Sequence, residues 1–333
     1  MQRLFRLLLT QYKFTLILII LGILSWSYYP REFTYSGRTM GTQFTVKAYK
    51  RFYIPKKRLI SDINRQLIQL SAQFNTYTNK SQISVFNKER ELNALSDDWR
   101  YLLGISEQLY RVSNGAWDPT VWPLTQLWKF NTDDVFVPPS DSDIKKTLAQ
   151  TGFHQLNYDG EKLVKKTMVA QLDLSSIAKG YAVDVLSQTL LESGIKQFYV
   201  EIGGEIRVGE PRQGQAFWRL GIQDPLNTQT GEVVDVLKLS NMSLATSGTY
   251  RQFRKWKGRS YSHIIDPRTG YPISHHVISV SVMHPLCAIA DGLATALMVL
   301  RPEEREAFLS AYPKAKVLLY ERNHNQIKKI ELP

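Results

Sequence analysis

Apolar and polar residues recur with two different periods along the chain, and these periods separate expected helices from expected strands. Leu59, Ile63 and Leu67 recur at helical spacing, which predicts a helix over 56–74. Residues 42–48 alternate between apolar and polar, as in a strand with one buried face. The same patterns predict further helices over Trp99–Val112, Asp141–Thr151, Ser176–Ser193, Leu286–Leu300 and Pro302–Ala311. Further strands are expected over Leu163–Met168, Phe198–Ile202, Phe217–Ile222, Val233–Leu239, Ser260–Asp266, Val277–Met283, Lys316–Tyr320 and the C-terminus, with a loop over Gly115–Leu124.

The order of these elements indicates the fold class. Helices and strands mix without the regular strand–helix–strand rhythm of a wound parallel sheet, and no segment repeats at a fixed period. No low-complexity linker divides residues 30–333. The expected fold is therefore a mixed α/β (α+β) body, formed as a single compact domain.

The N-terminal segment has the pattern of an export signal. Residues 14–26 carry no charge and follow Arg3, Arg6 and Lys13. We expect residues 1–29 to be an uncleaved signal-anchor in the cytoplasmic (inner) membrane of a bacterium. Cleavage near Ser25 and a buried core helix are the alternatives. With the basic end held in the cytoplasm, the body is expected on the periplasmic side.

Composition excludes several classes of protein. Of the 333 residues, 43% are hydrophobic and 22% are charged, which excludes a mainly disordered or collagen-like chain. Only the N-terminal segment is apolar enough to approach a bilayer span, which excludes a polytopic membrane protein. The single cysteine, Cys287, excludes an intramolecular disulfide and a multi-thiolate metal site, and its apolar surroundings predict a buried structural residue.

The net charge of +12 is compatible with anionic lipid, nucleic acid or a phosphorylated ligand. Residues 251–259 interleave basic residues with Phe253 and Trp256, as a nucleic-acid stripe would. A solvated hairpin or a contact with acidic lipid is the preferred interpretation, and no nucleic-acid partner is expected. Nucleotide-binding glycine motifs and the H-E-x-x-H zinc motif do not occur.

The helix expected over 286–300 carries the sharpest chemical signal. Asp291 and Thr295 are four residues apart and project from one face of a helix that is otherwise apolar. A carboxylate in such surroundings needs compensation. It either accepts hydrogen bonds from nearby backbone or, with the hydroxyl, binds a hard cation such as Mg²⁺.

A second signal lies where a strand is expected to lead into the helix over 176–193. Asp173 is followed by small residues and by Lys179 in the first helical turn. A lysine opposes the helix dipole there unless an anion lies nearby, although an ordinary capped helix is the alternative.

Three loops also contain candidate functional residues, but their patterns are less specific than those of the two helices. Gly203 and Gly204 lie between expected strands, where a turn or a close ligand contact favours glycine. Asp118 precedes a proline in the loop at 115–124 and is compatible with a tight turn. His263 precedes a Pro/Gly turn and is a candidate general base, although a single histidine is more often structural.

Taken together, these segments resemble the ApbE family of FAD:protein FMN transferases. The resemblance runs in sequence order from Met40-Gly41-Thr42 to the helix of Asp291 and Thr295, through the segments at 74–87, 115–124, 173–184, 202–204, 243–250 and 262–270. Trp117 stands where the family commonly has Phe, and Ser175-Ser176 stand where a Gly-rich pair is commoner. No lipobox cysteine is present, so lipid attachment of the kind found in many relatives is excluded.

The resemblance implies an exported, Mg²⁺-dependent enzyme that transfers FMN from FAD to a Ser or Thr of an acceptor protein. The acceptors implied are subunits of sodium-pumping quinone reductase and Rnf-type complexes. The implied FAD contacts are Met40, Tyr77, Ala116, Trp117, Asp118, Asp173, Lys179 and Ile265. The implied magnesium ligands are Asp291 and Thr295, with backbone oxygens of Ser176 and Ala294.

The expected roles in catalysis follow from phosphate chemistry. Lys179 would offset charge on the departing AMP, and His263 is the candidate base for the acceptor hydroxyl, although nearby Asp residues are alternatives. Two rival functions use the same residues: hydrolysis of FAD to FMN and AMP, and FAD binding without turnover. A basic module that binds lipid or nucleic acid is a third alternative. It ranks last, because such a module would not need the Asp291–Thr295 pair.

Overall fold

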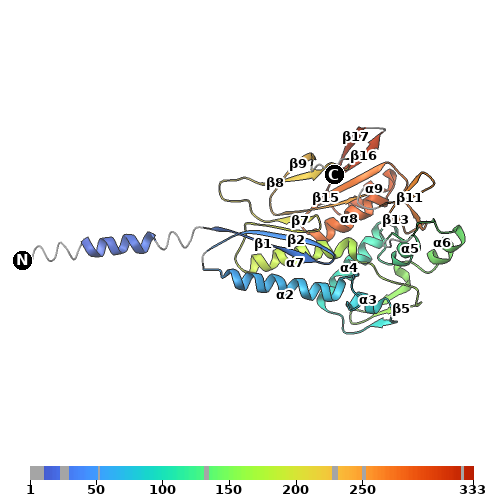
Figure 1. The fold of residues 1–333 in the computed structure, drawn as a ribbon, viewed down its shortest axis with the longest axis horizontal. Helices are drawn as coiled ribbons and strands as arrows, with labels where there is room; N and C mark the ends of the chain where they lie inside the picture. Colours follow the sequence, from blue (N-terminus) through green and yellow to red (C-terminus); the bar gives the residue numbers. More distant parts are fainter. Residues whose placement is uncertain are drawn as a thin grey trace, which may run out of the picture.

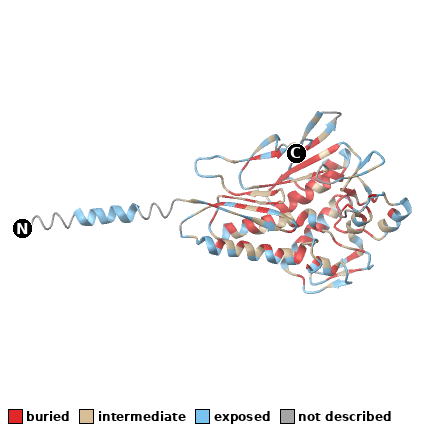
Figure 2. Ribbon diagram, viewed as in Figure 1, coloured by how far each residue is buried: buried red, intermediate tan, exposed pale blue. Residues whose placement is uncertain are grey.

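The computed structural model describes residues 11–22, 30–51, 53–130, 135–226, 232–249, 253–323 and 326–333. Residues 11–22 form a helix whose side chains are all exposed (Figure 2). Within the described ranges, no helix is long and apolar enough to cross a membrane. The rest of the expected anchor, residues 1–10 and 23–29, lies outside the described residues.

An antiparallel sheet of eight strands forms the centre of the body (Figure 1). Met40 and Gly41, with φ of 47° and 77°, form a two-residue turn between the first two strands, where positive φ matches the twist of a hairpin. The spatial order is β1 (Arg31–Thr39), β2 (Thr42–Lys50), β6 (Phe198–Ile202), β7 (Glu205–Val208), β10 (Met242–Gly248), β15 (Val277–His284), β16 (Lys316–Asn323) and β17 (Gln326–Leu332).

Strand alternation divides the core between the two faces of this sheet. On β16, Val317 and Leu319 pack into the main apolar core, whereas Leu318 and Tyr320 pack into a second cluster on the opposite face. Three long helices cover the first face: α2 (Lys56–Phe74), α7 (Ser175–Glu192) and α8 (Cys287–Val299). The hairpin of β8 (Trp218–Gln223) and β9 (Val233–Leu239) covers the second (Figure 1).

Shorter elements surround these layers. Helix α4 (Asp97–Val112) packs against α7 and α8. The others are α3 (Gln82–Phe86), β3 (Glu91–Leu92), α5 (Trp122–Leu127), α6 (Asp141–Leu148), a 3-10 turn (Phe153–Gln155), β4 (Leu156–Tyr158), β5 (Leu163–Lys165), β11 (Phe253–Trp256), β12 (Arg259–Ser262), β13 (Ile265–Asp266), β14 (Tyr271–Pro272) and α9 (Pro302–Ser310).

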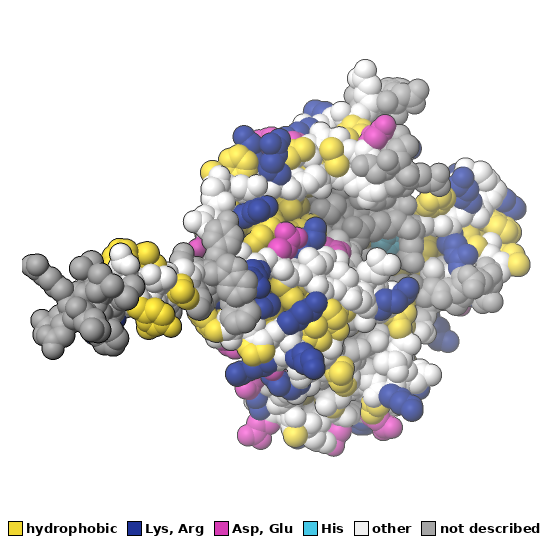
Figure 3. All heavy atoms as spheres, turned by 60° about the vertical axis from the view of Figure 1, so that its left-hand side comes forward, with side chains coloured by type: hydrophobic (Ala, Val, Ile, Leu, Met, Phe, Trp, Pro, Cys, Tyr) yellow, Lys and Arg dark blue, Asp and Glu magenta, His cyan; other side chains and the backbone are white. Residues whose placement is uncertain are grey.

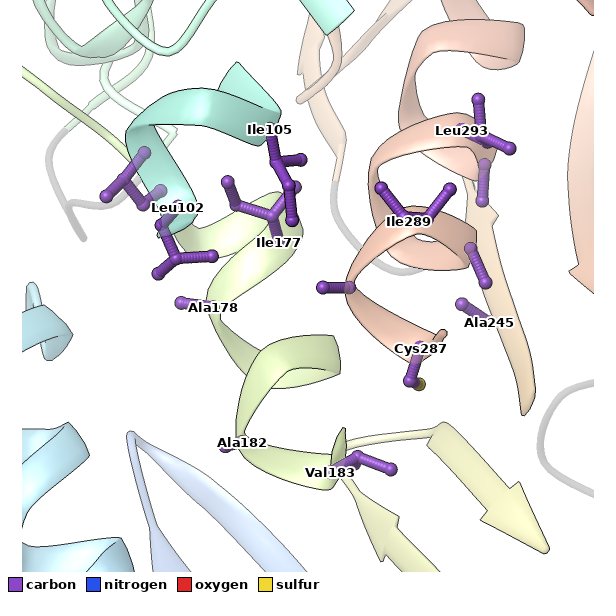
Figure 4. Close-up of a cluster of buried hydrophobic side chains, with 14 of the residues drawn as sticks. Leu102, Ile105, Ile177, Ala178, Ala182, Val183, Ala245, Cys287, Ile289 and Leu293 are labelled. Carbon is purple, nitrogen blue, oxygen red and sulfur yellow. The ribbon is translucent and has the colours of Figure 1, made fainter. Parts of the chain in front are cut away.

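Helices α7 and α8 approach each other closely because glycine stands at their contact. A Cβ atom on Gly180 would lie 2.5 Å from the carbonyl oxygen of Cys287 and 2.9 Å from the Cα of Ala288. Figure 4 shows the two helices side by side within the apolar cluster that Ile105 of α4 and Ile177 of α7 share. Any larger residue at position 180 would push the helices apart.

We therefore expect Gly180→Ala to destabilise the protein, although Ala normally favours a helix over Gly by about 1 kcal/mol. The clash is with backbone atoms, and over-packing of this kind costs about 1–3 kcal/mol. The matched control is Gly104→Ala in α4, where the added Cβ meets nothing within 4 Å and a gain of up to about 1 kcal/mol is expected. Urea midpoints measure both. Equal stabilisation by the two substitutions would contradict the close approach.

The start of α8 is fastened to α7 by a buried carboxylate. Asp184 Oδ1 and Oδ2 accept hydrogen bonds from the backbone N–H groups of Cys287 and Ala288, each at 2.9 Å. Arg207 Nη1 of β7 donates to Asp184 Oδ1 at 2.8 Å. Burial raises the pKa of Asp184, while the two N–H groups and Arg207 oppose that shift. One side chain thus joins two helices and the sheet.

Most predicted helices and strands are confirmed to within a few residues. The continuous strand over Ser260–Asp266 is wrong, because Ser262 Oγ accepts the N–H of Ile264 at 3.2 Å and the chain bends between β12 and β13. The loop expected over 115–124 ends early, since α5 begins at Trp122. Strands β1, β7 and β10 of the central sheet were not predicted, nor were the short strands β3, β4, β11 and β14 outside it.

Two smaller predictions are confirmed. Cys287 is buried, and this burial raises the pKa of its thiol well above the ordinary value, as expected for an unreactive structural residue. Residues 253–259 of the basic stretch lie in the β11–β12 hairpin, which ends at Ser262. Arg251, at the start of that stretch, lies outside the described residues.

Candidate active site

A cavity of about 960 Å³ opens where the Met40-Gly41 turn, the N-terminal end of α7, α8 and β10 meet the loops at 74–77, 116–118 and 263–267. The face of the molecule in Figure 3 is hollowed near its middle, where acidic, basic and histidine side chains gather. The lining includes a polar group of side chains around Lys179 and Asp291, called here the polar end, and an aromatic group around Trp117, called the aromatic end. These two ends are described in turn.

A lysine between two buried carboxylates dominates the polar end. Lys179 Nζ lies 3.6 Å from Glu205 Oε1 of β7 and 3.6 Å from Asp291 Oδ2 of α8. It also donates to the backbone oxygen of Ser175 at 2.7 Å, and Asp291 Oδ2 accepts the N–H of Gly180 at 3.2 Å. The close α7–α8 contact thus holds a cation and an anion side by side at the cavity wall.

Hydroxyl groups extend the polar end beside Asp291. Thr295 Oγ1, one turn further along α8, lies 3.1 Å from Ser247 Oγ of β10. Both hydroxyls and the Asp291 carboxylate, whose residue is only 3% exposed, line the cavity. Asp291 thus accepts a backbone hydrogen bond, the first of the two alternatives open from the sequence, while binding of a hard cation, the second, stays a prediction for this position on the cavity wall.

The donor set fits Mg²⁺. Among the described residues, no three His, Cys, Asp or Glu side chains come together as a metal site. Magnesium needs no such group, because it is commonly held by one or two carboxylates, with substrate phosphate and water completing the shell. The Asp291 carboxylate and Thr295 hydroxyl provide hard oxygens, and Ser176 also lines the cavity. Ala294 is buried and is not among the lining residues, and an alanine could offer a metal only its backbone oxygen.

The other end of the cavity is apolar and centred on Trp117. This residue is 3% exposed, and its indole Nε1 donates to Ser176 Oγ at 3.1 Å. Its backbone N–H donates to Ser113 Oγ at 2.9 Å, so ring and backbone are both fixed. Other apolar residues that line the cavity are Ala116, Val121, Trp122, Phe130, Ile264 and Ile265. Such a lining suits a planar aromatic ring system.

Asp118 and Asp173 shape the loops at the cavity wall. Asp118 Oδ1 accepts the backbone N–H and the hydroxyl of Thr120 at 2.8 and 2.7 Å. Burial raises the pKa of Asp118, although these bonds oppose the shift. Asp173 Oδ1 accepts the N–H of Ser175 at 2.8 Å, and the Asp173 N–H donates to Pro119 O at 2.7 Å, which joins the two loops. Each carboxylate therefore fixes its own turn, and the backbone bond from Asp173 to Pro119 joins the start of α7 to the Trp117 loop.

Tyr77 stands at the mouth of the cavity. It is 80% exposed, and a Cβ atom on Gly41 would lie 2.7 Å from its ring. The positive φ of 77° at Gly41 also disfavours a side chain there. The β1–β2 turn, which carries Met40, thus packs directly against the Tyr77 ring.

His263 lies in the bend between β12 and β13 and lines the cavity. The loop after it is fastened by Arg268, which donates to Asp266 Oδ1 and Oδ2 at 2.9 Å and to Glu304 Oε1 of α9 at 2.7 Å. Burial alone would raise the pKa of Glu304, but hydrogen bonds from the side chain and backbone N–H of Arg301, together with the Arg268 pair, lower it to about 2. The histidine therefore sits on a bend that is held from outside the cavity.

The structure brings every predicted site residue except Ala294 to the lining of this one cavity. Their roles toward FAD and Mg²⁺ stay predictions. Sequence reasoning missed Glu205 and the β10 residues Thr246 and Ser247, which also line it. Glu205 directly follows the noted Gly203-Gly204 pair, and this adjacency was its only signal.

The ApbE family model matches residues 40–319, which span the cavity-lining segments. The chain belongs to the ApbE family. The Vibrio cholerae protein named FAD:protein FMN transferase is 38% identical to this ApbE-family chain over 280 residues, covering 83% of this chain and 84% of the relative. The Haemophilus influenzae protein of the same name is 36% identical, with 80% of each chain covered.

Solved structures of the family have the same fold. The flavin transferase ApbE from Vibrio cholerae superposes with a TM-score of 0.80 at 35% identity, over 91% of this ApbE-family chain and 97% of the other. The apo form of the Pseudomonas stutzeri flavinyl transferase ApbE also gives a TM-score of 0.80, at 34% identity, over 91% and 95% of the two chains.

Proposed function

We propose that this chain is an FAD:protein FMN transferase, which moves the FMN half of FAD onto a Ser or Thr hydroxyl of an acceptor protein. The observation that carries the proposal is one cavity with an aromatic end at Trp117 and a charged end at Lys179 and Asp291. Its volume of about 960 Å³ is at the upper end of the ~300–1,000 Å³ typical of small-molecule sites, as a dinucleotide requires. Relatives with 36–38% identity carry the same activity in their names.

Magnesium is part of the proposal, with Asp291 and Thr295 as side-chain ligands and backbone oxygens of Ser176 and Ala294 completing the protein's share. When bound, the ion would neutralise diphosphate charge and polarise the phosphorus. Lys179 lies within 3.6 Å of the Asp291 carboxylate, so it is close enough to stabilise charge on departing AMP. The Trp117 ring, fixed by Ser176, would orient the flavin.

Transfer of FMN from FAD to the acceptor hydroxyl needs no reactant besides these two molecules. The acceptor hydroxyl oxygen forms a bond to the FMN phosphorus as the bond between that phosphorus and the AMP oxygen breaks. His263 takes the hydroxyl proton, and AMP leaves with the bonding electron pair. The acceptor thus gains FMN through a phosphoester bond.

We also propose the cellular setting that the N-terminal segment favours. The side chains of residues 14–21 are exposed and almost all large and apolar, and Arg3, Arg6 and Lys13 precede or begin this run. A segment of this kind supports attachment to the cytoplasmic membrane with the body on the periplasmic side. Acceptors there would be flavin-carrying subunits of sodium-pumping quinone reductase or Rnf-type complexes.

The test incubates the full-length chain with FAD, Mg²⁺ and such an acceptor subunit, and follows acceptor mass and in-gel flavin fluorescence. A mass gain of one FMN on Ser or Thr, lost on chelation of the metal, is the expected result. Release of FMN and AMP without labelled acceptor would indicate a hydrolase instead. FAD recovered unchanged from the protein would indicate a carrier.

His263→Asn is expected to lower kcat by about 10²–10⁴-fold, the range that a positioned general base provides. FAD affinity should change little, because the histidine acts on the acceptor hydroxyl. The control is His276→Asn, an exposed histidine on the same stretch of chain. Single-turnover rates measured across pH separate the two. If His263→Asn keeps the wild-type rate and pH profile, another group is the base.

A further inference from the structure

We propose that the end of the body where β1 begins is a docking surface for anionic phospholipid, which we call the basic end surface. It rests on the proposed membrane attachment and goes beyond the transferase reaction. Its residues are Arg31, Lys50, Arg51, Lys56, Lys57, Arg58 and Arg212, with the aromatic residues Tyr49, Tyr53 and Trp218.

Contacts between neighbouring segments place these residues together. Arg31 is the register partner of Lys50 at the open end of the β1–β2 hairpin. Lys50 Nζ donates to the backbone oxygen of Ile54 at 2.9 Å, which brings the loop before α2 to the same end. The Arg212 guanidinium lies 5.4 Å from the ring centroid of Tyr49. Three segments that are separate in sequence, at 31, 49–58 and 212, thus contribute to one surface.

The start of α2 contributes cations that oppose the helix dipole, although Arg58 Nε also lies 3.9 Å from Asp62 Oδ2 in the same helix. Lys56, Lys57 and Arg58 are its first three residues, and its first turn contains no acidic residue. Cations at a helix N-terminus oppose the helix dipole by about 0.3–1 kcal/mol each. All three side chains are exposed. An external anion would compensate for this local cost, and a layer of lipid phosphates provides many.

Aromatic residues among the cations favour a lipid surface over a dissolved anion. The rings of Tyr49 and Trp218 lie 6.4 Å apart, and Tyr199 continues the row at 6.3 Å from Trp218. Tyr53 is 62% exposed. Tyr and Trp are enriched at membrane interfaces, where their rings reach the headgroup level. Glu32 and Glu210 also lie at this end, and Glu210 pairs with Lys196 at 3.8 Å.

The position of the surface relative to both the N-terminal segment and the cavity fits docking. Residues 23–30 connect the exposed apolar helix to Arg31, and they carry no charged residue. Strand β1 then runs nine residues away from this end, about 30 Å at strand spacing, to the Met40 turn at the cavity. In Figure 1, β1 begins at the end of the body opposite α5, α6 and β11. Docking would therefore direct the cavity away from the bilayer, toward an acceptor.

The experiment compares hydrogen exchange of the full chain in nanodiscs of phosphatidylcholine with exchange in nanodiscs that also contain phosphatidylglycerol. We expect slower exchange at residues 47–58 and 209–218 on the anionic discs, reversed by high salt. Lys56→Gln with Lys57→Gln should lower the docking equilibrium constant about 25-fold, about fivefold per charge. The matched control, Lys145→Gln with Lys146→Gln, removes two exposed lysines from α6 and should leave docking unchanged.

Three results would overturn the proposal in distinguishable ways. Equal exchange on both kinds of disc would reject the docking surface while leaving membrane attachment in place. Failure of the chain to insert into phosphatidylcholine discs would reject the attachment. Protection that appears only with an acidic acceptor protein would assign the surface to that partner. FMN transfer to a free acceptor, measured in parallel, tests the proposed activity separately, and thermal stability equal to or above wild type would exclude misfolding of the α2 variant.

Discussion

Asp291→Asn is expected to lower the rate of FMN transfer by roughly 1,000-fold. The amide keeps an oxygen that can accept the N–H of Gly180, so the α7–α8 contact survives. What is lost is the charge that would bind Mg²⁺ and balance Lys179. Metal stabilisation of a transition state is worth several kcal/mol, and each 1.36 kcal/mol corresponds to a factor of ten.

The measurement is single-turnover transfer at saturating FAD over a range of Mg²⁺ concentrations. Wild type should show saturation by the metal, and the variant should need far higher concentrations or show no saturation. Glu306→Gln provides a carboxylate-to-amide control at an exposed position of α9. A rate within tenfold of wild type, with an unchanged magnesium requirement, would remove Asp291 from the metal site.

Features of the site that depend on local geometry could be predicted from the sequence. Asp291 and Thr295 share a helix face because of their spacing, whatever the rest of the fold does. Lys179 was conspicuous because its charge, near the N-terminal end of the expected helix over 176–193, opposes the dipole. The resemblance in sequence order then linked these positions to Trp117 and His263, which lie on loops without regular periodicity.

Features that depend on tertiary contacts could not be predicted from the sequence. Lys179 meets Asp291 only because Gly180 lets α7 and α8 approach, and no periodicity encodes that distance. Ser247 reaches Thr295 from β10, a strand of small and hydroxylated residues without clear alternation. Glu205 belongs to the four-residue strand β7, which is too short for a periodic signal. Burial of polar groups is decided by neighbours distant in sequence.

Asp184→Ala is expected to lower the free energy of unfolding by about 3 kcal/mol. Breaking a buried ion pair costs about 3–5 kcal/mol, and the lower end applies here because the Arg207 side chain is partly exposed to solvent. The substitution also leaves the N–H groups of Cys287 and Ala288 at the start of α8 without their acceptor. The loss is a large fraction of the 5–15 kcal/mol typical of a folded protein. Denaturant midpoints with a common m-value measure it.

Two further variants separate the buried network from the loss of any aspartate. Asp159 accepts two backbone N–H groups in an exposed turn, as Asp184 does in the core, and Asp159→Ala should shift the midpoint far less. Adding Arg207→Met to Asp184→Ala should recover part of the stability, because the second change removes the uncompensated guanidinium. If Asp184→Ala unfolds at the wild-type midpoint, or if the double variant is simply additive, the carboxylate does not couple α7, α8 and β7.

Since Asp291 is in the second turn of α8, a loosened helix start would also lower transfer activity without changing any cavity residue.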